Sequence, residues 1–313
     1  MEKIVEINNL VKRYKDLIAV DHLNLQVNEG EILGLLGPNG SGKTTTLNCL
    51  MALLSYDKGE ITVFGKPMKP ESYRQKRDIG VVLQNVAVFE SFTVYENIDF
   101  FCGLYISDKK KRREYVEDAI RFVELDGFRK FYPKKLSGGL LRRLNIACGI
   151  AHKPRLIILD EPTVAVDPQS RNKILEGIQE LNRQGATIIY TSHYMEEVEQ
   201  ICSRIVILDK GRNIAEGTAD QLKQMIKNSE TIVIQVPKLA QEHLAQIQAM
   251  KHIYSVDYAE QQLMIKCNGG DHNLIHVMNY LQEQEIVFGK VYSELPTLND
   301  VFLEITGKAL RDD

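Results

Sequence analysis

The sequence predicts an α/β fold followed by a smaller α+β unit, and three observations predict it. In the first two-thirds of the chain, short β-branched runs alternate with longer helical patterns, which is typical of a mostly parallel sheet covered by helices. Several of these runs are apolar without alternation, as in strands buried on both faces. After about Gly217 the order becomes strand, helix, strand, strand, helix, strand, which is the ferredoxin-like order.

Five short runs are expected to form the main sheet. They are Glu31 to Leu36, Gly80 to Leu83, Leu156 to Leu159, Thr187 to Thr191 and Ile205 to Leu208. Three earlier runs alternate between apolar and polar residues, with Gly or Asp turns between them, and we expect an antiparallel sheet there. These are Val5 to Leu10, Leu23 to Val27 and Glu60 to Phe64. Helix formers dominate from about residue 85 to 150, which predicts a helical insertion.

The change of pattern near Gly217 predicts a domain boundary. We expect a first domain over residues 1–218, a linker over 219–229 with the helix Gln221 to Lys227, and a second domain over 230–313. A length of 313 residues suits two cores. The elements expected in the second domain are the strand Thr231 to Val236, the helix Leu239 to Met250, the strands Tyr254 to Tyr258 and Leu263 to Cys267, the helix His272 to Glu283 and the strand Val287 to Tyr292.

The composition is that of an ordinary globular protein and disfavours several classes. A net charge of −3 argues against a nucleic-acid-binding face, and the basic run Lys109 to Arg113 is interpreted as a solvated helix start. No segment resembles a secretory signal or approaches the roughly 18 apolar residues that cross a bilayer. We therefore expect a cytoplasmic chain that does any membrane work with a partner. The five scattered cysteines, none spaced as CxxC, indicate reduced thiols.

A phosphate-binding loop is the strongest motif. Residues Gly37 to Thr44 fit GxxxxGK[ST] and lie between an expected strand and an expected helix, Thr45 to Leu54. The glycines let successive backbone N–H groups face a phosphate, Lys43 supplies a cation to the β and γ phosphates, and the Thr44 hydroxyl can ligate Mg²⁺. The residues expected to bind nucleotide here are Gly37, Asn39, Gly40, Ser41, Gly42, Lys43, Thr44 and Thr45.

An apolar strand that ends in two acids is the second motif. Leu156 to Leu159 is followed by Asp160 and Glu161, and a buried strand has no structural use for two adjacent charges. Asp160 is suited to hold Mg²⁺, directly or through water, and Glu161 to orient and deprotonate an attacking water. The alternative is a strand-end turn with two solvated acids, which is disfavoured beside a phosphate loop.

Five further motifs distinguish among the protein families that share a phosphate-binding loop. In chain order they are Tyr14, Gln84, the segment Leu136, Ser137, Gly138 and Gly139, then Asp167 and His193. In this order they resemble the adenine-stacking aromatic, Q-loop, LSGGQ signature, D-loop aspartate and switch histidine of ABC ATPases. Each alone is weak, because a lone Ser-Gly-Gly is more often a turn and a lone His more often structural. Their occurrence together and in the order of the family, over about Ile4 to Gly217, indicates that family.

The resemblance implies an ATP hydrolase with two half-sites that needs a second ATPase subunit, a homodimer being favoured over a heterodimer. It implies ATP and Mg²⁺ as cofactors. The implied catalytic residues are Glu161, His193 and Gln84, and the implied metal ligands Thr44, Gln84 and Asp160. Ser137 and Gly139 are implied to act on the ATP of a second subunit, Gly138 and Asp167 are implied to belong to the nucleotide-binding residues, and Tyr14 is implied to stack on the adenine.

Two positions depart from the family pattern. Leu140 stands where the signature usually has Gln, and Ala165 stands where the D-loop usually has Gly. Leu140 removes a polar contact near the nucleotide, and Ala cannot take positive φ as freely as Gly. We expect altered rates and retained activity.

The resemblance also implies a membrane partner. The start of the helical insertion, with Val86, Val88, Phe89, Phe92 and Tyr95, is where the family docks a cytoplasmic helix of its integral-membrane permease, although aromatic residues at such spacing also form plain core. The tail from Pro296 to Asp313 resembles the end of the bacterial drug and antibiotic export group, which uses a separately encoded permease. We therefore expect a cytoplasmic ATPase that is peripheral on the inner face of the cell membrane, without nucleic acid as a partner.

Two other interpretations stay open at this stage. One is a soluble ABC ATPase that acts mechanically in translation or DNA maintenance, although such members usually carry two cassettes or a long coiled coil. The other, compatible with transport, makes the second domain a ligand-sensing or dimerising accessory unit.

Overall fold

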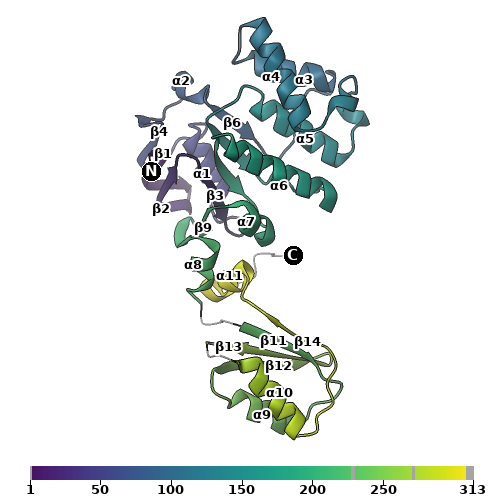
Figure 1. The fold of residues 1–313 in the computed structure, drawn as a ribbon. Coiled ribbons are helices and arrows are strands. Elements are labelled where there is room, and N and C mark those ends of the chain that lie inside the picture. The colour runs from purple at the N-terminus through teal and green to yellow at the C-terminus, as the bar shows by residue number, and fades with distance from the viewer. Residues whose placement is uncertain (1, 227–229, 270–271, 308–313) are drawn as a thin grey trace. The chain divides into compact units, whose positions relative to one another are not determined.

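The computed structural model describes residues 2–226, 230–269 and 272–307. Its contacts divide the chain into two compact units, the first ending at Thr218 and the second beginning at Ala219. Figure 1 shows both units in one colour ramp from the N-terminus to the C-terminus.

A six-stranded sheet forms the centre of the first unit. Its strand order is β10-β9-β3-β8-β7-β6, and all neighbours are parallel except β10, which is antiparallel to β9. Every residue of β3, β7 and β8 is buried, as their unbroken apolar runs predict. The bounds are β3 Ile32–Leu36, β6 Ile79–Val82, β7 Leu156–Asp160, β8 Thr187–Thr191, β9 Arg204–Asp209 and β10 Arg212–Gly217.

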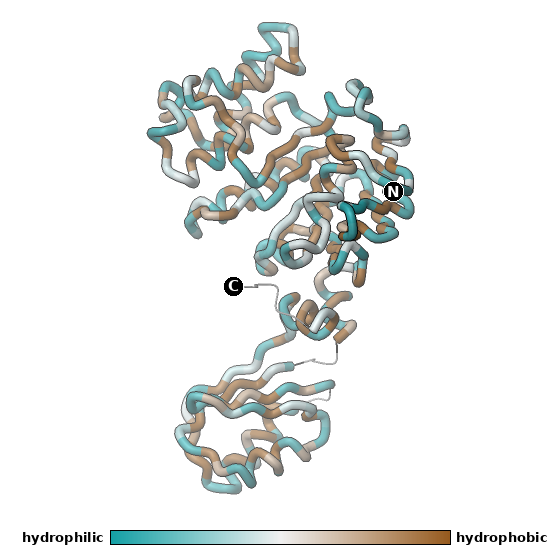
Figure 2. The backbone as a smooth tube through the Cα atoms, turned by 180° about the vertical axis from the view of Figure 1, so that it is seen from behind, coloured by the Kyte–Doolittle hydropathy of each residue, from teal (hydrophilic) through white to brown (hydrophobic). Residues whose placement is uncertain are grey.

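A four-stranded antiparallel sheet, ordered β2-β1-β4-β5, lies beside the first. Its strands are β1 Lys3–Tyr14, β2 Leu17–Asn28, β4 Lys58–Val63 and β5 Lys66–Pro67. Alternate residues such as Ile7, Leu25 and Ile61 join Leu33 and Leu50 in one hydrophobic core shared by the two sheets and helix α1, Lys43–Leu50. Figure 2 shows hydrophobic residues running along the strands of this unit.

Helices fill the block between β6 and β7, as expected. They are α3 Val94–Gly103, α4 Lys109–Phe122 and α5 Gly138–Ile150, after the short α2 Tyr73–Lys76. Side chains fix their starts: Thr93 and Glu96 form a capping box on α3, Asp108 caps α4, and Ser137 caps α5. Two more helices, α6 Pro168–Arg183 and α7 Met195–Ile201, follow β7 and β8.

The second unit has the ferredoxin-like order that the sequence predicts. Its sheet is antiparallel and ordered β12-β13-β11-β14. Ile232 and Ile265 from the sheet pack with Ile247, Val277 and Leu281 from the helices in a core of its own. The elements are α8 Ala219–Lys223, β11 Glu230–Gln235, α9 Gln241–Gln248, β12 Ile253–Ala259, β13 Gln262–Cys267, α10 Asn273–Glu283, β14 Val291–Glu294 and α11 Leu298–Thr306.

Several expected bounds were wrong. Helix α1 begins at Lys43 instead of Thr45, directly after its N-cap Gly42. It ends at Leu50 instead of Leu54, because Ala52 adopts a left-handed φ of 50°. The last strand is β14, Val291–Glu294, instead of Val287 to Tyr292. The linking helix is α8, Ala219–Lys223, instead of Gln221 to Lys227, and Lys227 lies outside the described residues.

The structure can be compared with two expectations from the sequence, one on the cysteines and one on membrane-spanning helices. All five cysteine side chains are free thiols, and four of them are buried: Cys49, Cys102, Cys148 and Cys267. Among residues 2–226, 230–269 and 272–307, no helix is both long and apolar enough to span a bilayer.

A buried histidine is expected to make the first unit sensitive to acid. His152, which follows α5, is 7% exposed. Its Nε2 lies 3.3 Å from the Ile79 carbonyl oxygen, and its ring stacks on Tyr105 at 3.9 Å. Burial lowers the pKa of His152 from 6.5 to about 4, although the Ile79 carbonyl and Asp78 raise it.

The free energy of unfolding should therefore fall as the pH falls from about 6.5 to 4, because the unfolded chain binds a proton in that window and the folded chain does not. The loss is on the order of 3 kcal/mol at most. We expect His152→Gln, which can still bond to Ile79, to flatten this part of the pH profile in urea titrations. His276→Gln, on the exposed face of α10, is the control; equal slopes for the two variants would contradict the assignment.

Candidate nucleotide site

The phosphate loop joins the end of β3 to the start of α1. Gly42, the N-cap of α1, has a φ of 100°, and a Cβ there would lie 2.4 Å from the Ala19 carbonyl oxygen. Gly40 also has a left-handed φ, 79°. These positions require glycine. The helix start directs its free N–H groups and partial positive charge toward the loop, as anion sites at helix N-termini do.

Lys43 lies at the centre of this loop and is nearly removed from water. It is 6% exposed, and its Nζ donates to the carbonyl oxygens of Gly37 at 2.6 Å and Pro38 at 3.1 Å. Burial lowers the pKa of Lys43, while the charges of Glu161 and Asp160 raise it. Ser41 Oγ is also buried, with no hydrogen-bond partner among the described residues. An anion with acceptor oxygens fits these donors.

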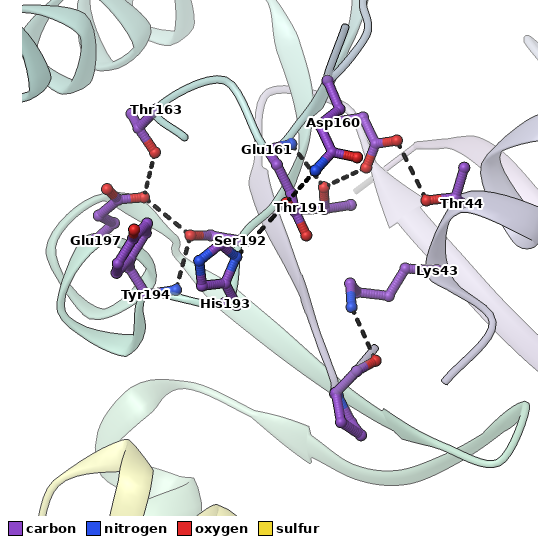
Figure 3. A network of polar contacts seen from close by, with 12 residues as sticks. Lys43, Thr44, Asp160, Glu161, Thr163, Thr191, Ser192, His193, Tyr194 and Glu197 are labelled. Carbon is purple, nitrogen blue, oxygen red and sulfur yellow. Dashed lines mark hydrogen bonds and ion pairs between the residues drawn. The ribbon is translucent and has the colours of Figure 1, made fainter. Parts of the chain in front are cut away.

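Asp160 ends β7 and faces the phosphate loop. Its Oδ2 accepts from Thr44 Oγ1 at 3.3 Å, and its Oδ1 accepts from Thr191 Oγ1 at 2.6 Å. Figure 3 shows these contacts between α1, β7 and β8. Thr44 itself is exposed, so a carboxylate and a reachable hydroxyl lie side by side. Such hard oxygen ligands are those that Mg²⁺ prefers.

Glu161 follows Asp160 and takes a strained backbone conformation. Its φ is 49°, and its N–H donates to Thr191 Oγ1 at 3.0 Å. Its Oε2 accepts from Gln84 Nε2 at 3.0 Å. The same oxygen lies 3.5 Å from His193 Nδ1 (Figure 3). A positive φ on a non-glycine residue costs about 1–2 kcal/mol and clusters at functional sites. The structure thus brings Gln84, Glu161 and His193 to one point beside Asp160.

A buried carboxylate, Glu197 of α7, supports the His193 loop and was missed by the sequence interpretation. Its Oε2 accepts from Ser192 Oγ at 2.9 Å, and Ser192 Oγ accepts from Tyr194 N at 2.9 Å. The same oxygen accepts from Thr163 Oγ1 and Tyr190 OH. His193 therefore stands between two anchored neighbours (Figure 3). The only signal in the sequence was that Thr163 and Ser192 adjoin recognised motifs.

The signature segment and the D-loop form a second group. Ser137 caps α5 by accepting from Leu140 N, and Asp167 caps α6 by accepting from Ser170 N at 3.0 Å. A Cβ on Gly139 would lie 2.5 Å from Ser170 Oγ, so the two helix starts are in close contact. Among the described residues, no hydrogen bond or ion pair joins this group to the phosphate loop.

The remaining predicted residues lie at the surface of the first unit. Tyr14, at the end of β1, is 45% exposed and has Lys12 Nζ 5.2 Å from its ring centre. Asn39 is exposed, Thr45 and Leu140 are half-buried, and Gly138 is exposed. Their side chains and backbone are accessible to a ligand.

Signature helix α5 also holds the Q-loop, a contact that the sequence interpretation did not anticipate. Arg142 donates to the Gln84 carbonyl oxygen at 2.8 Å and to that of Leu83 at 3.2 Å. Asn145 accepts from Ala87 N at 3.1 Å.

A glycine-rich loop at a helix start, a buried lysine and a strand ending in two acids define a P-loop nucleotide hydrolase. A family model for ABC transporters matches residues 20–164. The linearmycin resistance ATP-binding protein of Bacillus subtilis is 36% identical over 312 residues, covering 99% of this chain and 100% of that protein. The Nod factor export ATP-binding protein I of Burkholderia thailandensis is 33% identical over 317 residues, covering 98% of each.

Solved structures agree with these relatives. The dimeric structure of MJ0796, a bacterial ABC transporter cassette, has a TM-score of 0.63 and 28% identity, covering 68% of this chain and 98% of that one. The chain belongs to the ABC transporter family as an ATP-binding subunit, and ATP hydrolysis is the activity of that family. The resemblance and the P-loop fold class inferred from the sequence are confirmed.

Ala165 carries a strain that glycine would relieve. Its φ is 59°, a left-handed conformation that costs an alanine about 1–2 kcal/mol. We expect Ala165→Gly to raise the free energy of unfolding by roughly 0.5–1 kcal/mol, because the relief exceeds the added chain entropy of glycine.

Urea titration of the full chain measures this change. Ala119→Gly, within helix α4, is the control and should be destabilising by about 1 kcal/mol. A destabilised Ala165→Gly would show that the methyl group contributes more by packing than its φ costs.

Proposed function

We propose that this chain binds Mg·ATP on its phosphate loop and hydrolyses it in a dimer to drive export of a substrate through a separate membrane permease. The observation that carries the proposal is Glu161, held by Gln84 and 3.5 Å from His193, next to the Asp160 and Thr44 pair. Relatives named for linearmycin resistance and Nod factor export support the direction of transport.

Mg²⁺ fits the oxygen donors beside the loop. Thr44 Oγ1, Asp160 and the side-chain oxygen of Gln84 are the ligands that we assign to it, since Mg²⁺ takes hard oxygen ligands from protein and phosphate together. When bound, it would neutralise charge on the phosphate oxygens.

Three side chains of the protein are assigned the remaining roles in ATP binding and hydrolysis. Lys43, already desolvated, would exchange its bonds to the Gly37 and Pro38 carbonyls for bonds to phosphate oxygens. Glu161 would orient the attacking water and accept its proton. His193 would hold the γ-phosphate, leaving its present position near Glu161.

A second cassette would complete each site. Ser137, Gly138 and Gly139 at the start of α5 lie against the start of α6, which Asp167 caps, and within the described residues none of them is bonded to the phosphate loop of its own chain. This arrangement suits contact with the ATP of a second subunit, for which a homodimer is favoured. Solved cassette dimers support this arrangement.

The permease would dock on aromatic residues of the helical insertion. Phe89, Phe92, Phe100 and Phe101 form a cluster with ring centres 5.0–5.9 Å apart. Phe89 is 44% and Phe100 40% exposed. A groove of about 500 Å³ beside them is lined by Phe92, Tyr95 and Phe100. An apolar surface rimmed by charges suits an amphipathic helix, which would hold the chain at the inner face of the membrane.

The second domain, residues 230–313 after a linker over 219–229, is proposed as an accessory unit of the same ATPase. Its separate core within the described residues supports this division.

Replacing Glu161 tests the proposed chemistry. Glu161→Gln keeps the size and the contact with Gln84 but removes the base, so we expect ATP binding within about twofold of wild type and a kcat lower by about 10²–10⁴-fold. Steady-state ATPase assays and binding of a fluorescent ATP analogue measure both. Glu176→Gln, at an exposed position of α6, is the control. Turnover close to wild type in Glu161→Gln would remove Glu161 as the base.

Replacing Phe100 tests the docking surface. Phe100→Glu should leave the ATPase activity of the isolated chain within about twofold of wild type, because Phe100 takes part in none of the catalytic contacts described above. Co-purification with the permease, and stimulation of ATPase activity by it, should be lost because a charge would be buried against an apolar partner. Tyr73→Glu, 71% exposed on α2, should keep both. Unchanged co-purification for Phe100→Glu would move the docking site elsewhere.

A further inference from the structure

Arg142 of α5 is buried without a carboxylate partner. It is 5% exposed, and none of the ion pairs among the described residues includes it. Burial lowers the pKa of Arg142, and the charge of Glu161 raises it. A buried cation is costly unless hydrogen bonds compensate it. The hydrogen bonds recorded for it are the two to the carbonyl oxygens of Leu83 and Gln84, at 3.2 and 2.8 Å.

Asn145, three residues further along the same helix face, bonds to both ends of the same segment. Its Oδ1 accepts from Ala87 N at 3.1 Å, and its Nδ2 donates to the Leu83 carbonyl oxygen at 3.4 Å. Residues 83–87 belong to no helix or strand. Their position is therefore set by side chains of α5 and not by a backbone ladder. We call Arg142 and Asn145 the α5 clasp.

The clasp connects two parts of the site that the sequence places far apart. Helix α5 starts at the signature segment, where Ser137 and Gly139 adjoin the D-loop. The segment that the clasp holds carries Gln84, whose Nε2 donates to Glu161 Oε2 at 3.0 Å. A single 13-residue helix thus spans from the signature to the Q-loop.

We propose that Arg142 is a positioning residue that ties the place of Gln84, and through it Glu161, to the place of the signature segment on the same chain. This inference rests on the proposed function, in which the signature contacts the ATP of a second subunit. Closure of the signature on that ATP then moves the Q-loop of the same chain, so that the two sites of a dimer become catalytically ready together. The clasp contributes to kcat and to cooperativity between the sites, and not to ATP affinity.

Arg142→Met tests this role, because Met fills a similar volume and leaves no buried charge. Its matched control is Arg143→Met, on the same helix, whose side chain bonds instead to the Val123 carbonyl and Glu124. For the full chain we expect kcat to fall by about 10- to 100-fold in Arg142→Met, the range for a lost charge-assisted hydrogen bond. We expect the Hill coefficient to fall toward 1 and the affinity for a fluorescent ATP analogue to stay within about twofold.

Combination with Gln84→Ala separates positioning from a general structural role. If Arg142 acts through Gln84, the double variant should be no more than about twofold slower than the slower single variant. Multiplying losses, lost ATP affinity or a kcat equal to that of Arg143→Met would each overturn the inference.

Arg142→Lys covers the case in which the Met variant does not fold. Both carbonyl oxygens accept from Arg142 Nη1, and a lysine ammonium keeps the charge but lies one bond closer to the backbone than this nitrogen. The kcat should therefore remain below wild type with ATP affinity retained; a wild-type kcat would overturn the role. Glu161→Gln, assayed in parallel, distinguishes the two failures. If Glu161→Gln loses turnover while the kcat of Arg142→Met equals that of Arg143→Met, the positioning role of Arg142 is refuted and the proposed function stands. If Glu161→Gln keeps turnover, the assignment of Glu161 as the base is refuted.

Discussion

The burial of three charged groups at one edge of the central sheet is the constraint on which the rest of this structure depends. Lys43, Asp160 and Glu161 are 6%, 5% and 8% exposed, and such charges persist in a protein interior only when they are paired and hydrogen-bonded. The parallel strands β3, β7 and β8 end at the same edge, which brings the lysine loop and both acids together. Thr191 at the end of β8 donates to the Asp160 carboxylate and accepts from the backbone N–H of Glu161, which fixes the Asp160 side chain and the Glu161 backbone.

The same constraint explains where the backbone is strained. Glu161 and Ala165 both have left-handed φ values, 49° and 59°, within one turn that leaves β7 and enters α6. The turn has to direct the Glu161 side chain toward Gln84 and His193 and then place Asp167 as the cap of α6. Burial of Thr163 and Val166 packs this turn against the core and offsets the cost of its conformation.

The sequence was sufficient for features that depend on local pattern. The phosphate loop, the acid-ended strand and the capped starts of α5 and α6 each arise from a few adjacent residues, and β8 has the expected bounds, Thr187–Thr191. Bounds set by a single backbone conformation, such as the end of α1 at Ala52, were missed. So were the contacts of Arg142 with Gln84, 58 residues apart, and of Glu197 with Thr163, 34 residues apart. A polar residue on a helix gives no sequence signal of which distant group it meets.

The burial of the thiols has a practical consequence for spectroscopy. Desolvation raises the pKa of Cys49, Cys102 and Cys267 to about 11, and it also raises the pKa of Cys148 and Cys202. At neutral pH very little thiolate is present at any of them, and the thiolate is the form that reacts with alkylating labels. An exposed cysteine introduced at a surface position would thus react first in the otherwise native chain. The opening and closing of a labelled pair of subunits could then be followed by fluorescence without first removing the natural cysteines.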